Sequence, residues 1–212
     1  MFDRRQFIVT ASALGIAPAV ASAAFAQDVK VDMAELLKPG PLPEKVLGSE
    51  TAKVTIVEYA SMTCGHCANF HTRTLPHIKK TYIDTGKVRM IFREFALDPV
   101  AAAVSMLARC APEEKYHDVV SAFFETQASW ARAENIVGAL RQVSLQLGFT
   151  QESFNACLTN QTLLDGVNAV KTRGETEFKV TSTPTFFING TMYRGAMSPD
   201  EFDKILAPLV GG

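Results

Sequence analysis

The chain has 212 residues, of which 47% are hydrophobic and 20% are charged, and its formal net charge at pH 7 is −1. This length and composition are typical of one soluble globular domain with a sizeable core, or of one domain that carries an inserted subdomain. The nearly neutral charge argues against nucleic acid as a partner, because a basic patch is the usual footprint of such binding, and no stretch has the length and apolarity of a membrane span.

The first 26 residues differ in composition from the rest of the chain. Arg4 and Arg5 are followed by an apolar stretch rich in small residues over positions 7–20, and an A-x-A pattern ends at Ala26. This is the three-part layout of a secretory signal peptide. We therefore predict a cleavable signal peptide over residues 1–26 and a periplasmic location, with the RRQF segment resembling a twin-arginine export signal. The alternative interpretation is that these residues form a core helix of a longer domain.

An arm and the first part of an α/β domain follow. Residues 27–44 contain the proline-rich segment KPGPLPE, which predicts a semi-rigid arm. Residues 45–96 begin the domain with KVTIVEYA at 53–60, a nearly continuous apolar run that is typical of a strand buried on both faces. A helix that bends at Pro76 and a second strand at 87–95 complete a βαβ unit.

The middle of the chain has a different pattern. From Pro99 onward it is helical for about eighty residues, too many for a loop, so we predict an all-helical insertion over residues 97–178. Residues 179–212 return to the sheet, with a hairpin turn at Asn189-Gly190 and a final helix. The predicted fold class is α/β, with the element order βαβ, helical insertion, ββα.

Two cysteines lie at the predicted junction of the first strand and its helix, in the segment EYASMTCGHC. Residues i and i+3 of a helix share one face, so the sulfurs of Cys64 and Cys67 can meet. Cys64 lies at the helix N-terminus, where unpaired N–H groups and the dipole favour negative charge, and this predicts a pKa below the usual value of about 8.5. We therefore predict that Cys64 is the nucleophile and that Cys67, one turn deeper, is the resolving thiol.

Two further side chains are candidates for tuning this pair. His66 can donate a hydrogen bond or present positive charge to the Cys64 sulfur, which stabilises the reduced form and makes the disulfide a stronger oxidant; the alternative is a structural role. Glu58 lies inside an otherwise apolar strand, where an unpaired buried carboxylate is costly. It is either a proton shuttle for the dithiol or an exposed edge residue.

The other cysteines and histidines have simpler interpretations. Cys110 and Cys157 lie in the predicted insertion, and in an exported protein they predict a structural disulfide, the alternative being two separate buried thiols. Cys64, Cys67 and His71 share a helical face, but structural zinc usually needs four ligands, so we predict no metal site and no cofactor. Surface or half-buried positions are expected for three histidines, His71, His77 and His117.

The blocks TIVEYASMTCGHCANFH and STPTFFING, with the helical stretch between them, resemble the DsbA family of thioredoxin-fold oxidoreductases, including its Com1-like branch. The resemblance implies a thioredoxin fold, a central mixed β-sheet flanked by helices, with an inserted all-helical subdomain. It implies Cys64 as the exposed nucleophile, Cys67 as its partner in a redox-active disulfide, and Glu58 as the buried acid of the family.

The resemblance also implies a cis peptide bond before Pro184, which spacing alone does not reveal. Thr183 and Pro184 would then lie beside the dithiol and bind the substrate chain. Two residues depart from the best-known DsbA: Gly65 replaces a proline and resembles protein disulfide isomerase, and Thr183 replaces a valine and resembles the isomerase-type DsbC and DsbG branch.

These features lead to three functional hypotheses. The first is a periplasmic thiol:disulfide oxidoreductase that donates the Cys64–Cys67 disulfide to reduced secreted polypeptides and is reoxidised by a DsbB-like membrane quinone reductase. The second is a disulfide isomerase or reductase that a DsbD-like membrane electron donor keeps reduced. The third is a metal-binding or chaperone module whose cysteines do not turn over.

Overall fold

The computed structural model describes residues 30–211, so the predicted signal peptide at 1–26 lies outside the described residues. The centre of the fold is a five-stranded mixed sheet in the order β1-β3-β2-β4-β5, in which β2 and β3 are parallel and the other neighbours are antiparallel. All seven residues of the central strand β2 are buried, as its apolar run predicts. The strands are β1 Lys45–Leu47, β2 Val54–Ala60, β3 Val88–Glu94, β4 Thr185–Ile188 and β5 Thr191–Arg194.

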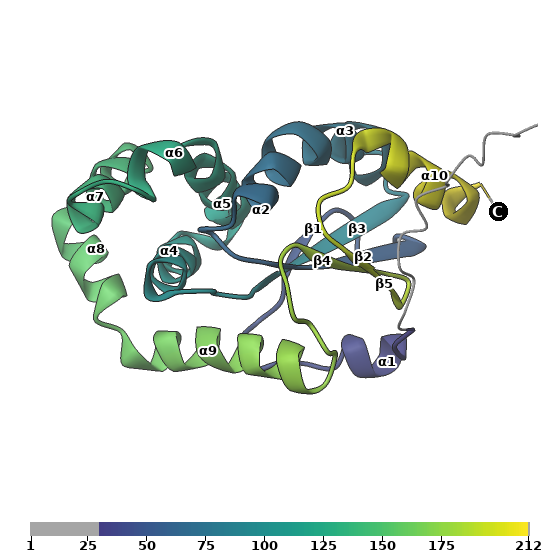
Figure 1. The fold of residues 1–212 in the computed structure, drawn as a ribbon, viewed down its shortest axis with the longest axis horizontal. Coiled ribbons are helices and arrows are strands. Elements are labelled where there is room, and N and C mark those ends of the chain that lie inside the picture. Colours follow the sequence, from purple (N-terminus) through teal and green to yellow (C-terminus); the bar gives the residue numbers. More distant parts are fainter. Residues whose placement is uncertain (1–29, 212) are drawn as a thin grey trace, which may run out of the picture.

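Helices cover both faces of the sheet (Figure 1). One face carries α10 and a helical run that starts directly after Cys64, and the other carries α1 and part of α9. Within the run, Pro76 lies in a short α-helical segment between two π-helical ones. Proline has no N–H for the carbonyl of Thr72, four residues earlier, so the α-helical hydrogen-bond pattern is interrupted where η1 precedes α3. These elements are α1 Met33–Leu36, α2 Gly65–Asn69, η1 Phe70–Thr74, α3 Leu75–Ile78, η2 Lys79–Ile83 and α10 Pro199–Val210.

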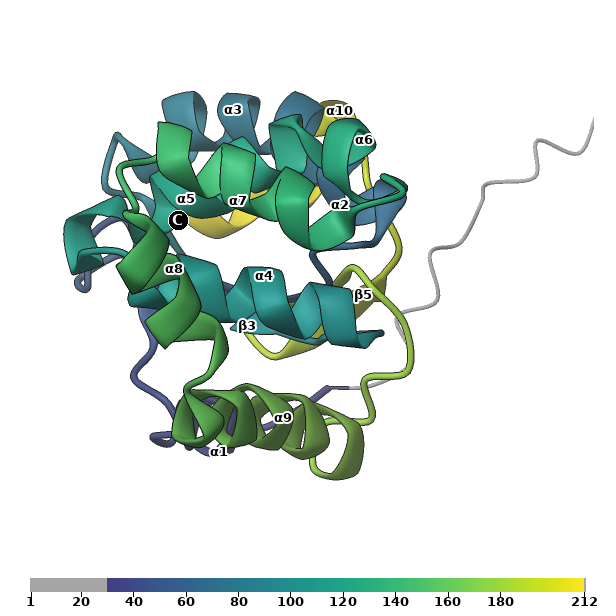
Figure 2. The same ribbon diagram turned by 90° about the vertical axis from the view of Figure 1, so that its left-hand side faces the viewer.

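Between β3 and β4 the chain forms the predicted helical insertion (Figure 2). Its helices share a core that includes the fully buried Trp130 and Phe123 and extends to Phe92 of the sheet. Thr150 begins one helix with a capping box, in which its hydroxyl and that of Ser153 bond to each other's backbone N–H groups. The helices are α4 Pro99–Cys110, η3 Glu113–Lys115, α5 Tyr116–Glu125, α6 Gln127–Trp130, α7 Ile136–Gln146, α8 Gln151–Leu158 and α9 Gln161–Thr176.

Short sequence patterns predict the C-terminal hairpin and the last helix, but they do not predict the first strand, β1. Asn189 and Gly190 have φ angles of 44° and 85° and form the two-residue turn between β4 and β5, which confirms the predicted hairpin. Ser198 and Glu201 form a capping box at α10. Sequence periodicity does not reveal β1, because it has only three residues and all are half-buried.

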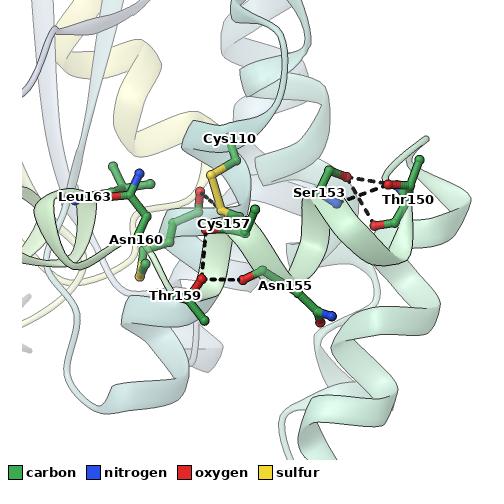
Figure 3. Close-up of a disulfide and its surroundings, with 10 residues drawn as sticks. Cys110, Thr150, Ser153, Asn155, Cys157, Thr159, Asn160 and Leu163 are labelled. Carbon is green, nitrogen blue, oxygen red and sulfur yellow. Dashed lines mark hydrogen bonds between the residues drawn. A yellow bond between two sulfur atoms is a disulfide. The ribbon is translucent and has the colours of Figure 1, made fainter.

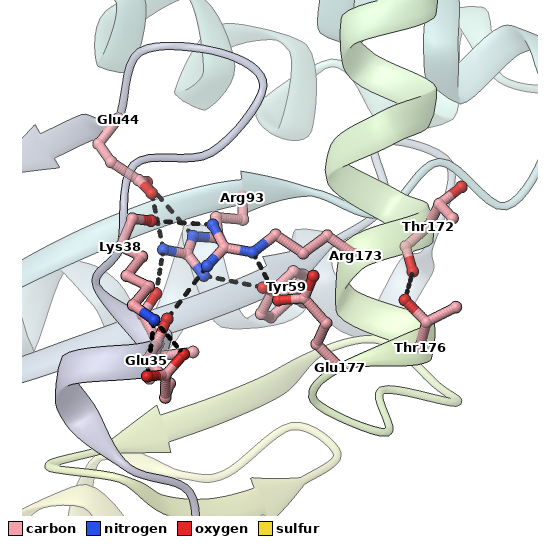
Figure 4. Close-up of polar contacts among 10 residues, drawn as sticks. Glu35, Lys38, Glu44, Tyr59, Arg93, Thr172, Arg173, Thr176 and Glu177 are labelled. Atoms are coloured by element: carbon pink, nitrogen blue, oxygen red, sulfur yellow. Dashed lines mark hydrogen bonds and ion pairs between the residues drawn. The ribbon is translucent and has the colours of Figure 1, made fainter.

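The described part of the N-terminal arm is fixed to the sheet and to α9 by arginines (Figure 4). The guanidinium of Arg93, on β3, donates to the Leu36 carbonyl at 2.7 Å, the Glu44 carboxylate at 2.6 Å and the Tyr59 hydroxyl at 2.8 Å. Arg173, on α9, donates to the carbonyl oxygen of Lys38 at 2.9 Å. Each bond is short and charge-assisted, so the arm is a fixed part of the fold on the sheet face opposite α2.

Candidate active site

The two cysteines of the C-x-x-C motif lie at the N-terminal end of the helical run, residues 65–83, which follows β2. Cys64 is the N-cap residue of α2, with φ −78° and ψ 119°, and Cys67 lies in the first turn of that helix. Both are free thiols, Cys64 partly exposed and Cys67 fully buried. A substrate therefore has access to the first sulfur and not to the second.

The two thiols have opposite pKa shifts. A hydrogen bond from the Cys67 thiol is the largest cause that lowers the pKa of Cys64 to about 5; burial opposes it, and the backbone N–H groups of Cys67 and His66 support it. Burial, the hydrogen bond to Cys64 and the charge of Glu58, in that order, raise the pKa of Cys67 well above its ordinary value. At neutral pH the reduced pair is thus a Cys64 thiolate beside a Cys67 thiol.

Glu58 faces the helical run from the centre of β2. Side chains alternate along a strand, so Glu58 shares its face with Val54 and Ile56, and it is fully buried. Its Oε2 atom lies 2.8 Å from Nε2 of His71. His71 is only 8% exposed, so the expectation of a surface or half-buried position is wrong for this residue. The π-helical segment η1 carries its ring into the core between Phe92 and Phe124.

The segment before β4 lies against the nucleophile. The Thr183–Pro184 peptide bond is cis. The Cys64 sulfur lies 3.4 Å from the Thr183 carbonyl oxygen, to which its thiol donates when protonated. A distant segment of the chain therefore lines the site, in the place that the resemblance to the DsbA family implies.

Gln127 is a further residue of the site. From the first position of α6, its side-chain amide donates to the carbonyl oxygens of Met62 at 2.8 Å and of Cys64 at 3.1 Å. The helical insertion thus holds the backbone on both sides of Thr63. No sequence pattern points to Gln127, because an isolated glutamine sixty-odd positions from the motif resembles any other polar helix residue.

The remaining predicted residues lie around this centre or apart from it. His66 is exposed next to Cys64. Cys110 and Cys157 are bonded, with an S–S distance of 2.11 Å, and join the end of α4 to the last turn of α8, near the junction of α8 and α9 (Figure 3). Within residues 30–211, no group of His, Cys, Asp and Glu side chains is arranged to hold a metal ion, and no helix is long and apolar enough to cross a membrane.

Known families and curated proteins match most of the chain. A family model described as Thioredoxin matches residues 42–207. A putative protein-disulfide oxidoreductase of Rickettsia bellii is 32% identical over 155 residues, which cover 69% of this chain and 57% of that protein. The chain therefore spans little more than half the length of this relative. Disulfide bond formation protein D of Bacillus subtilis is 23% identical, and the match covers 82% of this chain and 81% of that protein.

Solved structures match the fold with similar coverage. The crystal structure of α-DsbA1 from Wolbachia pipientis superposes with a TM-score of 0.77 at 33% identity, covering 84% of this chain and 95% of that one. Oxidised BdbD of Bacillus subtilis gives a TM-score of 0.71 at 21% identity, covering 80% of this chain and 94% of that one. These superpositions confirm the predicted fold class, a thioredoxin fold with a helical insertion.

Proposed function

The chain belongs to the DsbA family of thioredoxin-fold proteins, and we propose that it is a thiol:disulfide oxidase that donates its Cys64–Cys67 disulfide to reduced, exported polypeptides. The observation that carries this proposal is the split between the two thiols, an accessible Cys64 with a pKa of about 5 beside a buried Cys67 with a raised pKa. A thiolate stabilised only in the reduced state makes the disulfide a stronger oxidant.

The reaction consists of two thiol–disulfide exchanges. A substrate thiolate attacks the Cys64 sulfur of the oxidised protein, the bond to Cys67 breaks, and Cys67 leaves with the electron pair and takes up a proton. A second substrate thiolate then attacks the substrate sulfur of this mixed disulfide and releases Cys64 as a thiolate. The substrate loses two electrons and forms a disulfide, and the protein gains both. The low pKa of Cys64 favours the second step, because it makes Cys64 a good leaving group.

The surrounding residues have separate roles in this scheme. Glu58 exchanges a proton with Cys67, whose pKa its charge raises. His66 stabilises the Cys64 thiolate from the exposed side. The backbone of Thr183 and Pro184, next to the Cys64 sulfur, binds the substrate chain in extended form.

The proposal includes an exported location and a redox partner. The predicted signal peptide directs the protein to the periplasm, where a DsbB-like membrane quinone reductase accepts electrons from the reduced dithiol. The second candidate, an isomerase or reductase that a DsbD-like protein keeps reduced, rests on Gly65 and Thr183. The lowered pKa of Cys64 favours the oxidase, because a thiolate that is stabilised in the reduced form makes the disulfide a stronger oxidant.

Equilibration with glutathione buffers tests the direction of electron flow. We expect a reduction potential nearer to the value of about −120 mV for DsbA than to that of about −270 mV for thioredoxin, together with oxidation of a reduced two-cysteine peptide. The Cys64→Ser variant is the control, because it keeps the Cys110–Cys157 disulfide and loses the reactive pair. A potential near that of thioredoxin, with no oxidation of the peptide, would assign the protein to the reductase or isomerase class instead.

A further inference from the structure

A surface hollow lies beside the buried Glu58–His71 pair, between the helical run and α5. It has a volume of about 190 Å³, and His71 and His117 both contribute to its lining. The charged groups around it are Lys79 of η2 and Asp118 and Glu125 of α5. Within the described part of the chain, Nδ1 of His71 and Nε2 of His117 are buried and have no hydrogen-bond partner.

In the Glu58–His71 pair, each side chain has one polar atom in the bond between them and one polar atom without a partner among the described residues. Glu58 Oε2 bonds to His71 Nε2 at 2.8 Å, while Glu58 Oε1 and His71 Nδ1 have no partner among the described residues. The imidazole ring stacks on Phe124 with centroids 4.3 Å apart and meets Phe92 edge-on at 5.6 Å. These rings fix the imidazole plane, so one nitrogen stays on Glu58. Buried polar atoms without partners are uncommon in native structures and need an explanation.

Thiol–disulfide exchange supplies such an explanation, because it moves a proton at a buried atom. Cys67 has no exposed surface, yet it must gain a proton when its disulfide is reduced and lose one when the disulfide forms again. Glu58 acts on Cys67 electrostatically and is itself fully buried, so it cannot exchange protons with solvent directly. His71 also lines the hollow, which makes it the link between Glu58 and the surface.

We propose that His71 is a positioning residue that passes protons between this hollow and Glu58, and that the hollow is the proton entrance of the dithiol site. The inference rests on the proposed function and deepens it. As Cys67 leaves the disulfide, the pair delivers one proton to its sulfur through Glu58, and His71 takes a replacement at Nδ1 from water in the hollow when a side-chain movement uncovers this buried atom. The sequence runs in reverse when the pair is reoxidised. Burial lowers the pKa of His117, the other histidine that lines the hollow, and so favours its neutral form.

The test is the rate at which a peptide dithiol reduces the oxidised full chain, measured by stopped flow between about pH 5 and pH 9. We expect His71→Gln to react at least about tenfold more slowly than wild type, because glutamine can bond to Glu58 but cannot carry a proton. The ratio of the two rates should vary with pH. Imidazole added to His71→Ala should restore part of the rate by occupying the hollow. His77→Gln is the matched control, because His77 lies in the same helical run but pairs with Asp203 at the surface.

A second measurement needs no variant at all. The ¹⁵N NMR signals of the His71 ring should differ between the oxidised and reduced wild-type protein, whereas those of His77 should not. Equal rates for wild type and His71→Gln at every pH, or identical His71 signals in both redox states, would overturn the relay and leave the proposed function intact. A wild-type protein that does not exchange with the dithiol would instead refute the proposed function.

Discussion

At the scale of single residues, the redox chemistry comes from placing two identical side chains in different surroundings. Cys64 is partly exposed at a helix start, where backbone N–H groups and the Cys67 thiol stabilise its negative charge. Cys67 is buried one turn later, where its own charge would be unfavourable. One hydrogen bond therefore lowers one pKa and raises the other, because the proton stays on the buried sulfur.

The pH dependence of alkylation tests this difference. In the reduced protein the iodoacetamide reaction of Cys64 should reach half its maximal rate at pH of about 5 and stay nearly constant above about pH 6.5. An ordinary cysteine, with a pKa of about 8.5, would still gain rate at pH 8. By linkage, the thiolate stabilises the folded reduced protein fully above the unfolded pKa, and this contribution is lost as the pH falls through about 5. A rate that still rises steeply at pH 8 would contradict the assignment of Cys64 as thiolate.

The sequence alone identifies the residues whose chemistry is visible in a short motif. Cys64 and Cys67 stand out by their spacing, and Glu58 stands out because it is a charge in an apolar strand. His71 does not, because its place on the helical face of Cys64 and Cys67 does not show that the packing of η1 against Phe92 and Phe124 buries it beside Glu58. Gln127 is equally hidden, since its two bonds depend on how the insertion packs against the strand–helix junction.

At the scale of elements, the backbone at the start of α2 shows whether the C-x-x-C motif needs a glycine at position 65. Gly65 is the first residue of that helix, and a Cβ atom there would meet no atom within 4 Å. Cys64 before it has the extended backbone that proline requires of its predecessor. A glycine at this position is therefore not required by the fold.

Gly65→Pro should accordingly fold and gain about 0.4 to 1 kcal/mol, because proline suits the first helical position and restricts the unfolded chain. The pKa of Cys64 should remain low, since the substitution keeps the Cys67 thiol, which lowers it most, and the N–H groups of Cys67 and His66. Urea unfolding and the alkylation profile measure both effects. Loss of stability, or a Cys64 that titrates near pH 8, would show that Gly65 is needed for the local geometry.

The hydrogen bonds from Gln127 of α6 to the strand–helix junction can be tested by mutation. Gln127→Ala removes two hydrogen bonds and leaves the carbonyls of Met62 and Cys64 without this donor, which should cost about 1 to 3 kcal/mol in unfolding free energy. It should also slow the dithiol reaction, because the Cys64 backbone loses a support. Gln161→Ala is a suitable control, since among the described residues that amide donates to Asp165 on the exposed surface of its own helix. Equal losses in the two variants would argue against a special role for Gln127.

Elements differ in how well local patterns predict them. The hairpin at Asn189-Gly190 and the capping box at Ser198 and Glu201 are determined by residues next to each other, so the sequence predicts them. β1 has no such pattern and becomes a strand only by pairing with β3, forty-odd residues later.

At the scale of the whole molecule, the helical insertion and the sheet form one continuous core with the dithiol at their boundary. Cys67 and Met62 belong to the same cluster as Phe123 and Trp130 of the insertion. A buried polar network adds to this contact. Glu94, at the end of β3, accepts two bonds from Arg109 of α4 at 2.6 and 2.8 Å and one from the Tyr116 hydroxyl of α5 at 2.8 Å.

Because of this network, we expect the helical insertion and the sheet to unfold together. We also expect Arg109 to affect the stability of both strongly. Glu94 is fully buried and the Arg109 side chain is 6% exposed, so Arg109→Met leaves a buried carboxylate without its cation and should cost about 3 to 5 kcal/mol. The double variant Glu94→Gln/Arg109→Met should regain part of that loss, because the uncompensated charge is gone. Arg141→Met, which removes a part-buried hydrogen bond to the neutral Gln151, is the control. Urea unfolding followed by circular dichroism and by Cys67 alkylation should give one coincident transition in every variant. Separate transitions would mean that the insertion and the sheet are independent, and that the dithiol site forms without the helices that bury Cys67.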